Sequence, residues 1–407
     1  MKMDHLKQIG IENFDSYDLK GRLFEREEDF IVQEIEESGD TLKIERDLNQ
    51  ETIGEKQDYL TFTLVKRGLS TPEAIKTLAR NLHINVKRIA YNGNKDKRAL
   101  TSQKISIFKF DAERLNIDSD RFFCRDISYQ NNPCKIGKLY GNHFTVNVND
   151  FDSAGVNVDK IKASVEEGIP NFYGPQRFGS SSLNIEVSKS VFAGDFKSAF
   201  HSLVLKERIE SQLNSGKRND LRNLFEPYLD GGNIDKEKTG EYLNSLPNFM
   251  YFERESLSYL LEHKNDYAGA MRLMPKYIRL MIMQSFQYYV FNKTLSELLK
   301  SKSINEIKKE LPTIGYDMEI SESETDQITL GILKQEGIEN MEQLKLKSMP
   351  EVSLKTFLHP SFFIPENFEI LQTGGNAMIK FDLKKGSYAT ILLLKLFGEK
   401  SIFRTYE

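Results

Sequence analysis

The chain has 407 residues, of which 39% are hydrophobic and 29% charged, and its formal net charge is −4. This composition is typical of a folded protein with two or three domains, and it excludes a chain that is basic as a whole. Any nucleic-acid site must therefore be a local patch. We see no secretory leader pattern and no run of 18 apolar residues, so we expect a cytoplasmic protein without a membrane segment.

Cysteine and histidine usage argues against a metal or disulfide framework. The two cysteines, Cys124 and Cys134, match no zinc spacing, and two cysteines in a chain of this length favour a reducing compartment. The six histidines are scattered without the helical spacing of metal ligands. We therefore expect no metal.

The first part of the chain alternates as strands do. Alternating apolar residues predict strands at 59–65 and 103–108. A first strand is expected at 30–35, after an acidic run, and a short extended segment at 86–91. Before the third strand, Ser70 is followed by a proline in the first turn and by Glu73, which predicts a capped helix that runs to about Leu82. The segment 92–98 should then form a loop between two strands, where functional residues are often presented.

That loop carries the most distinctive charge pattern of the sequence. Asp96 is the only acid between residues 87 and 109, a window that also contains seven bases: Lys87, Arg88, Lys95, Lys97, Arg98, Lys104 and Lys109. Nearby cations favour an ionised carboxylate and attract polyanions, so we expect a low pKa for Asp96 and a patch that binds phosphates. Such a carboxylate suits a nucleophile or base acting on RNA or a nucleotide. The plain alternative is a surface turn in which Asp96 pairs with Lys95 or Arg98.

In the rest of the chain the expected secondary structure changes twice. A strand is expected at 141–148, and a loop at 166–179. The part from 185 to 350 is periodic in the manner of helices, and a strand at 378–383 and a helix at 388–397, capped by Ser387, follow it. We predict an α+β fold with a mixed, mostly antiparallel sheet and flanking helices. The catalytic domain would comprise 1–184 and 351–407, interrupted by a largely helical insertion of 185–350.

The loop at 171–179 has the composition of a base pocket. Its sequence, NFYGPQRFG, holds two amides, three rings and one guanidinium. Rings stack on bases, amides read base edges, and arginine binds phosphate. A well-ordered turn whose rings fill a core would have the same composition, and the sequence alone leaves both interpretations open.

A nucleotide switch is a weaker alternative. The segment Asn94-Lys95-Asp96-Lys97 is similar to the guanine-reading Asn-Lys-x-Asp of GTPases, but Lys97 stands where an acid is required. The sequence also lacks the phosphate-binding loop G-x-x-x-x-G-K-[ST]. A nucleoside triphosphatase is therefore not expected.

Three segments, in order, resemble the TruD family of RNA pseudouridine synthases. They are NGNKDKRALTSQKISI from Asn92, the 171–179 loop, and KGSYAT from Lys385. Weaker similarity lies in EDFIV from Glu28, GNHF from Gly141, and the pairs Phe286-Gln287 and Phe291-Asn292. The resemblance extends from about residue 21 to 397.

The resemblance implies an enzyme that breaks the bond between C1′ and N1 of a uridine in RNA and rejoins the base through C5. Asp96 falls on the family's essential aspartate, and whether it attacks C1′ or removes a proton from C2′ stays open. The family analogy indicates tRNA, at uridine 13, as the substrate, and needs neither cofactor nor metal. A monomer is favoured. A non-catalytic RNA-binding or RNA-folding module is the alternative.

The resemblance also assigns substrate contacts. Asn171 and Tyr173 fall where the family orients and stacks the target uracil, and Tyr388 falls on a second pocket ring. Further predicted contacts to the substrate are Lys95, Arg98, Gln103, Gln176 and Arg177.

The chain departs from the family pattern at three places. Tyr173 replaces a common phenylalanine, and Leu394-Lys395 replaces an Arg-Glu pair. Phe24 stands where the family often carries a lysine or arginine. The cation that pairs with Asp96 is therefore left open by the sequence.

Overall fold

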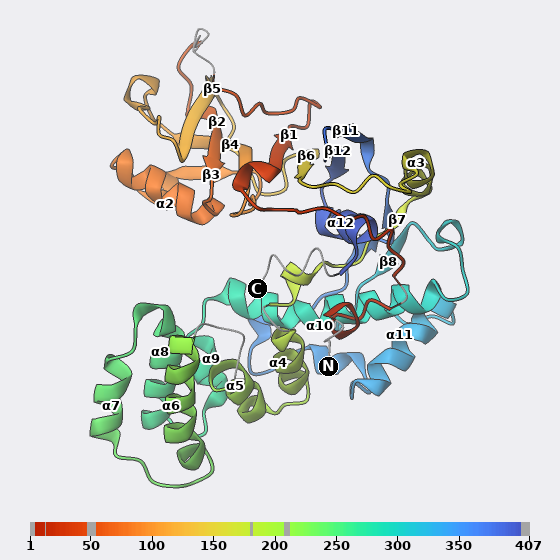
Figure 1. Ribbon diagram of the computed structural model, residues 1–407. Helices are drawn as coiled ribbons and strands as arrows, with labels where there is room; N and C mark the ends of the chain where they lie inside the picture. The colour runs from red at the N-terminus through yellow and green to blue at the C-terminus, as the bar shows by residue number, and fades with distance from the viewer. Residues whose placement is uncertain (1–4, 13, 47–53, 180–181, 207–211, 400–407) are drawn as a thin grey trace. The chain divides into compact units, whose positions relative to one another are not determined.

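The structure, a computed structural model, describes residues 5–12, 14–46, 54–179, 182–206 and 212–399 (Figure 1). The chain forms two compact units, which we treat separately. The sheet unit comprises Asp15–Ile169 and Phe363–Thr405, and the helical unit comprises Met1–Phe14 and Pro170–Phe362. The predicted α+β class is confirmed.

The unit boundaries differ from those expected at 184/185 and 350/351. The chain enters the helical unit at Pro170 and leaves it after Phe362. The reason is visible at Asn292, in the long helix α10 (Lys276–Leu298), whose side-chain amide holds both main-chain groups of Tyr173, at 2.8 and 3.0 Å. The same amide donates to the carbonyl of Ile9 at 2.9 Å, which ties the first residues of the chain to this unit as well.

The sheet unit is built on one large sheet. Among the described residues its strand order is β11-β12-β6-β1-β4-β2-β5, with β3 paired to β4. Strands β1 and β4 run parallel, and the other neighbours run antiparallel. The strands are β1 (Phe30–Ile35), β2 (Tyr59–Arg67), β3 (Ile89–Tyr91), β4 (Leu100–Phe108), β5 (Phe122–Gln130), β6 (Gly141–Val148), β11 (Glu366–Thr373) and β12 (Asn376–Lys384).

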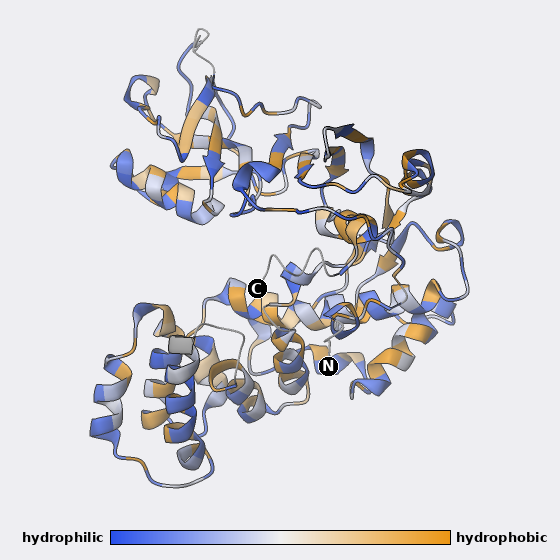
Figure 2. Cartoon of the chain, viewed as in Figure 1, coloured by the Kyte–Doolittle hydropathy of each residue, from blue (hydrophilic) through white to orange (hydrophobic). Residues whose placement is uncertain are grey.

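Helix α2 (Thr71–Asn81) packs on one face of this sheet, and the described part of the sheet unit contains two further α-helices. Helix α2 begins at Ser70, whose hydroxyl accepts from the Glu73 amide while the Glu73 carboxylate accepts from the Ser70 amide, as predicted. Its apolar side packs into a core with the apolar rows of β2 and β4. Helix α12 (Ala389–Phe397) is hydrophobic along most of its length (Figure 2) and is almost wholly buried. Helix α3 (Val158–Glu167) completes the unit.

Polar residues continue the core-facing rows of three central strands. On β2 the row Leu60, Phe62, Leu64 continues at Lys66, and all four side chains are fully buried. On β1 and β4 the corresponding rows contain Glu34 and Gln103, which are also fully buried. Successive strand residues point to opposite faces, so these three polar groups lie on the face that packs against helices. The loop that precedes β4 lies beside these three polar side chains.

The helical unit is organised around α10, which packs against α4 and α11. Most of its side chains beyond the first turn are buried. Its helices are α1 (His5–Gln8), α4 (Leu183–Phe192), α5 (Phe196–Val204), α6 (Gln212–Leu229), α7 (Lys236–Asn244), α8 (Tyr251–Glu262), α9 (Tyr267–Arg272), α10 and α11 (Glu324–Gln335). Strands β8 (Glu310–Pro312) and β9 (Leu358–Pro360) pair within it. The short strands β7 (Ile169–Pro170) and β10 (Phe362–Phe363) lie where the chain passes between units.

Two local predictions were wrong in detail. The segment 86–91 was expected to be extended, but Asn85 caps a 3-10 turn at Val86–Arg88, and only Ile89–Tyr91 forms a strand. Ser387 was expected to cap the last helix. Tyr388 occupies the cap instead, and the Ser387 amide closes a turn onto the Lys384 carbonyl. No helix in the described ranges is long and apolar enough to cross a membrane.

Candidate functional site

The loop Asn92–Ala99, between β3 and β4, is held by hydrogen bonds on several sides. The Lys95 amide donates to the Thr71 hydroxyl at 2.9 Å, and that hydroxyl donates to the Gln103 side chain at 2.9 Å. The Gln103 amide donates in turn to the Gly93 carbonyl at 3.2 Å. The start of α2 and the strand β4 thus fix the main chain that leads into Asp96.

Glu34 organises the floor of this loop. Its carboxylate, on β1, accepts from the Lys95 ammonium at 2.8 Å, from the Asn92 side chain at 2.9 Å and from the Lys104 amide at 3.3 Å. The side chains of Glu34 and Lys95 are 0% and 3% exposed. A buried carboxylate is tolerable only when it is paired and hydrogen-bonded in this way.

Lys66 holds the loop from β2. Its side chain is fully buried, and its ammonium donates to the main-chain carbonyls of Leu69 at 2.6 Å, Asp96 at 2.9 Å and Lys95 at 3.5 Å. Lys66 lies outside the basic window that the sequence singled out. Its positive charge nevertheless lowers the pKa of the Asp96 carboxyl more than the charge of Lys95 does.

The expected electrostatics of Asp96 needs correction. Asp96 is exposed to solvent, yet the protein atoms crowded around its carboxylate raise its pKa above the ordinary value, while Lys66 and, more weakly, Lys95 act to lower it. The sequence predicted a low pKa because seven bases stand nearby in the chain. Most of those bases are engaged elsewhere: Lys97 pairs with Glu73, Lys104 with Glu36, Lys95 with Glu34, and Arg88 binds the carbonyls of Phe108 and Lys109.

Two predicted substrate contacts are buried and bind protein groups. Lys95 and Gln103 were expected to touch the RNA, but both are buried, and their polar groups bind Glu34, Thr71 and Gly93. Neither can reach a phosphate without leaving these partners. Arg98, in the same loop, is exposed and stays a predicted contact.

The predicted pocket ring Tyr173 lies in the helical unit and is 2% exposed. Tyr288 stacks on it with ring centroids 4.0 Å apart, and His359 stacks on it at 4.3 Å. Two near-parallel rings this close to one centroid cannot share a face, so they cover opposite faces of Tyr173. The edge of Phe291 lies 5.3 Å away. The expected stacking of a uracil on Tyr173 would need Tyr288 or His359 to move.

The remaining predicted residues divide between the two units. Asn171 is buried in the helical unit. Its main-chain N–H donates to the carbonyl of Ser361 at 2.9 Å, and its main-chain carbonyl accepts from His359 Nε2 at 3.1 Å. Gln176 and Arg177 are exposed on the 3-10 turn Pro175–Arg177 of the same unit. Tyr388 is half-buried at the start of α12, in the sheet unit.

His359 gives a testable pH dependence of stability. Burial lowers the pKa of His359 from 6.5 to about 4. Between pH 4 and 6.5 the unfolded chain therefore binds more protons at this residue than the folded protein does. The contribution of the neutral His359 to the free energy of unfolding is full above pH 6.5 and is lost as the pH falls toward 4. The loss is on the order of 3 kcal/mol. Urea unfolding across this range should show a flatter profile for His359→Phe, which keeps a ring without a titrating group. Equal slopes in both proteins would contradict the assignment.

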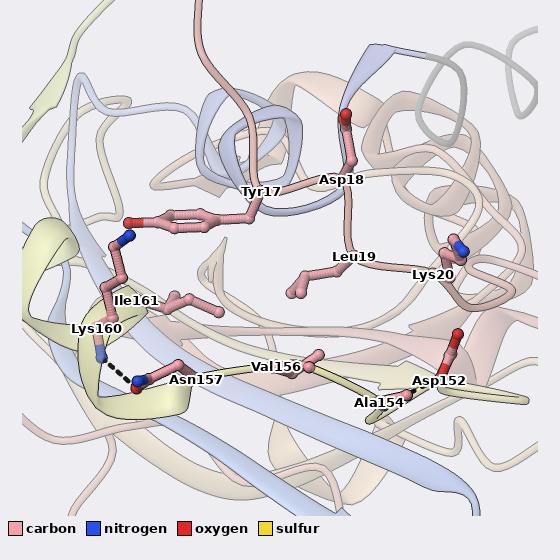
Figure 3. Close-up of a pocket in the computed structure, with 11 residues that line it drawn as sticks. Tyr17, Asp18, Leu19, Lys20, Asp152, Ala154, Val156, Asn157, Lys160 and Ile161 are labelled. Carbon is pink, nitrogen blue, oxygen red and sulfur yellow. Dashed lines mark hydrogen bonds between the residues drawn. The ribbon is translucent and has the colours of Figure 1, made fainter.

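A separate cavity of about 260 Å³ lies in the sheet unit between the segment Tyr17–Lys20 and the start of α3 (Figure 3). Its wall includes the capping residue Asn157, whose side chain accepts from the Lys160 amide at 2.9 Å. None of the predicted site residues lines it. In the described ranges, no three His, Cys, Asp or Glu side chains gather as a metal site would require.

Comparison with known proteins gives a consistent result. The family model for tRNA pseudouridine synthase D (TruD) matches residues 8–310 and 305–396. A protein from Methanosarcina mazei that carries this name is 28% identical over 449 aligned residues, which cover 95% of this chain and 96% of that protein. A protein of the same name from Nanoarchaeum equitans is 29% identical, over an alignment that covers 93% of this chain and 99% of that protein. The crystal structure of TruD from M. mazei matches with a TM-score of 0.73 at 26% identity, over 99% of this chain and 100% of that one.

Proposed function

Because this chain belongs to the tRNA pseudouridine synthase D (TruD) family, it is a pseudouridine synthase, and we propose that Asp96 is the carboxylate with which it converts a uridine of tRNA. By family analogy the target is uridine 13. The reaction is an isomerisation. The glycosidic bond from C1′ to N1 breaks, the uracil turns, and a bond from C1′ to C5 forms while the proton on C5 moves to solvent and N1 gains one.

The observation that carries the role of Asp96 is the way its loop is fixed. Lys66 binds the Asp96 carbonyl, Thr71 binds the Lys95 amide, and the buried pair of Glu34 and Lys95 anchors the preceding residue. A group that reacts with a ribose must be held in place before the substrate arrives, because each misplaced ångström costs rate. A mere surface ion pair would need no such support.

Two chemical roles for Asp96 fit this arrangement. As a nucleophile it would attack C1′ and carry the ribose while the uracil turns. As a base it would remove the proton from C2′ while the bond from C1′ to N1 breaks, and it would return that proton to C2′ as the bond from C1′ to C5 forms. Both roles need an ionised carboxylate, so we expect activity to fall on acidification as Asp96, whose pKa is raised, takes up a proton.

We propose that exposed polar residues of both units contact the tRNA. Arg98 in the sheet unit, and Gln176 and Arg177 in the helical unit, are candidates for the RNA backbone. Tyr388 and Asn171 remain candidates for holding and orienting the uracil. A monomer acting in the cytoplasm, where the free thiols of Cys124 and Cys134 persist, fits this proposal.

Neighbouring cations in the Asp96 loop should affect RNA binding differently. Replacing the exposed Arg98 by alanine should weaken binding and reduce the slope of log K against log salt by roughly 0.7 to 0.9 in magnitude, since one phosphate contact is lost. Replacing the buried Lys95 by methionine should leave that slope unchanged, because its ammonium faces Glu34. Filter binding over a range of salt concentrations measures both. If the salt slope fell in the Lys95 variant and stayed unchanged in Arg98→Ala, the assignment of Arg98 to the RNA and of Lys95 to Glu34 would be contradicted.

The function is tested by mapping pseudouridine in total tRNA from cells with and without the gene. We expect a uridine that is converted only when the protein is present, and the same loss in cells that carry only the Asp96→Asn form. An unchanged pseudouridine map would contradict the proposed activity.

A further inference from the structure

Lys66 is a buried cation whose position the reaction does not yet explain. Its side chain occupies the core-facing row of β2, directly after Leu60, Phe62 and Leu64, and it is fully buried. Its ammonium has three donors, and three main-chain carbonyls accept from it, at Leu69, Lys95 and Asp96. Two of these carbonyls, at Lys95 and Asp96, belong to the loop that carries the reactive carboxylate, and the third, at Leu69, lies between β2 and α2.

A buried ammonium is an expensive way to fill this space. Removing a charge from water costs several kcal/mol even when hydrogen bonds compensate for part of it, as a general estimate. Methionine has a similar volume and would continue the apolar row at little steric cost. The position therefore needs a reason to be charged.

The Lys66 ammonium lies 2.9 Å from the main-chain carbonyl of Asp96, so its positive charge stands close to the side chain of the same residue. Burial lowers the pKa of Lys66 to about 8, and the Asp96 carboxylate opposes that shift more strongly than any other charged group does. With this pKa the lysine is mostly protonated at neutral pH. Conversely, Lys66 acts to lower the pKa of Asp96 more strongly than Lys95 does.

We propose that Lys66 is a positioning residue for pseudouridine formation: it fixes the main chain at Asp96 and supplies the positive charge that keeps the Asp96 carboxylate ionised. This inference rests on the proposed function of Asp96. A tRNA brings many negative charges, which favour protonation of a nearby carboxylate. Exposed lysines would be drawn to the phosphates, whereas a buried ammonium stays with Asp96 when RNA binds.

Other charged groups around the pair do not replace this role. Lys95 is committed to Glu34 at 2.8 Å. Glu73, on α2, has a pKa of about 2 because Lys97 and Ser70 donate to it, so it stays ionised throughout the working range. Of the cations that act on Asp96, replacing Lys66 by a neutral residue should therefore raise the pKa of the Asp96 carboxyl most.

The test compares two neutral variants with a stability control. Lys66→Met removes the charge and the donors, whereas Lys66→Gln removes the charge and keeps an amide that can donate to the loop carbonyls. Phe62→Leu, on the same strand, perturbs the core without touching the loop. For each protein we would measure the thermal unfolding midpoint, tRNA affinity, and the single-turnover rate of pseudouridine formation between about pH 5.5 and 8.

We expect both Lys66 variants to lose about 10²-fold in rate near pH 6, with tRNA affinity unchanged, since preorganised electrostatic groups typically contribute this much. Their acid limb should move to higher pH, so that part of the rate returns as the pH is raised. Phe62→Leu should lose thermal stability but keep the pH profile of the unaltered protein. A purely structural lysine would lower stability without moving the acid limb.

The proposal fails if Lys66→Gln keeps the rate and the acid limb of the unaltered protein. It also fails if neither Lys66 variant folds, because the side chain would then serve the fold rather than the site. A failure of the proposed function is distinguishable, because the unaltered protein itself would then form no pseudouridine in the same assay.

Discussion

Asp96→Asn should bind tRNA normally and lose nearly all turnover. The substitution keeps the shape of the side chain and removes its charge and basicity. Both chemical roles considered for Asp96 require the carboxylate. We expect the single-turnover rate to fall by at least about 10⁴-fold, which corresponds to roughly 5 kcal/mol of transition-state stabilisation. Removing one negative charge should leave RNA affinity the same or slightly higher.

The matched control is Asp120→Asn, an exposed aspartate of the same unit that lies before β5. It should keep both affinity and rate. If Asp96→Asn retains more than about a tenth of the rate, a loss of under roughly 1.4 kcal/mol, Asp96 is not the reacting group. Its loop would then be an ordinary surface turn.

Breaking the buried pair of Glu34 and Lys95 should cost more stability than any surface substitution. Lys95→Met leaves the Glu34 carboxylate buried with only the Asn92 amide and the Lys104 main chain as donors. Glu34→Gln leaves a buried ammonium without its counter-charge. Each single variant should lose about 3–5 kcal/mol of unfolding free energy, as is usual when one partner of a buried pair is removed.

The double variant gives the control. Its loss should be smaller than the sum of the two single losses by about 1–3 kcal/mol, because neither charge is then left alone. Urea unfolding followed by circular dichroism measures all four proteins. Strictly additive losses would contradict the pairing, and a loss of RNA affinity without a loss of stability in Lys95→Met would restore the earlier expectation that Lys95 binds phosphate.

Much of the fold could be predicted because local patterns agree with the final structure. Strands β1 and β6 have the expected bounds, and α2 begins where its capping residues predicted. Strands β5 and β11 were missed, since FFCRDISYQ and ENFEILQT do not alternate cleanly between apolar and polar residues. Their pairing with β2 and β12 imposes the extended form.

The supporting residues of the site were missed although a signal was present. Glu34 follows Phe30 and Val32 in one row of β1, and Lys66 follows Leu64 in one row of β2. A charged residue in a core-facing row predicts a buried charge that must find a partner. Reading each strand by face would have singled out both residues, but not their partners, because partners are set by strands that are distant in the sequence.

The surroundings of Asp96 and of Tyr173 were not predicted, for a common reason. Sequence proximity suggested that seven bases surround Asp96, whereas the fold directs most of them to other acids and carbonyls. The family resemblance implied that Tyr173 presents a ring to the substrate, whereas the rings of Tyr288 and His359 cover its faces. The pairing of these bases and the covering of the Tyr173 ring both depend on tertiary contacts, which the sequence does not show.

The most direct measurement incubates the purified protein with one unmodified tRNA transcript and maps pseudouridine at nucleotide resolution over time. We predict conversion of a single uridine, at position 13, by the unaltered protein, and none above background by Asp96→Asn at equal RNA occupancy. A transcript that is bound by the unaltered protein but never converted would contradict the account and favour an RNA-binding or RNA-folding module.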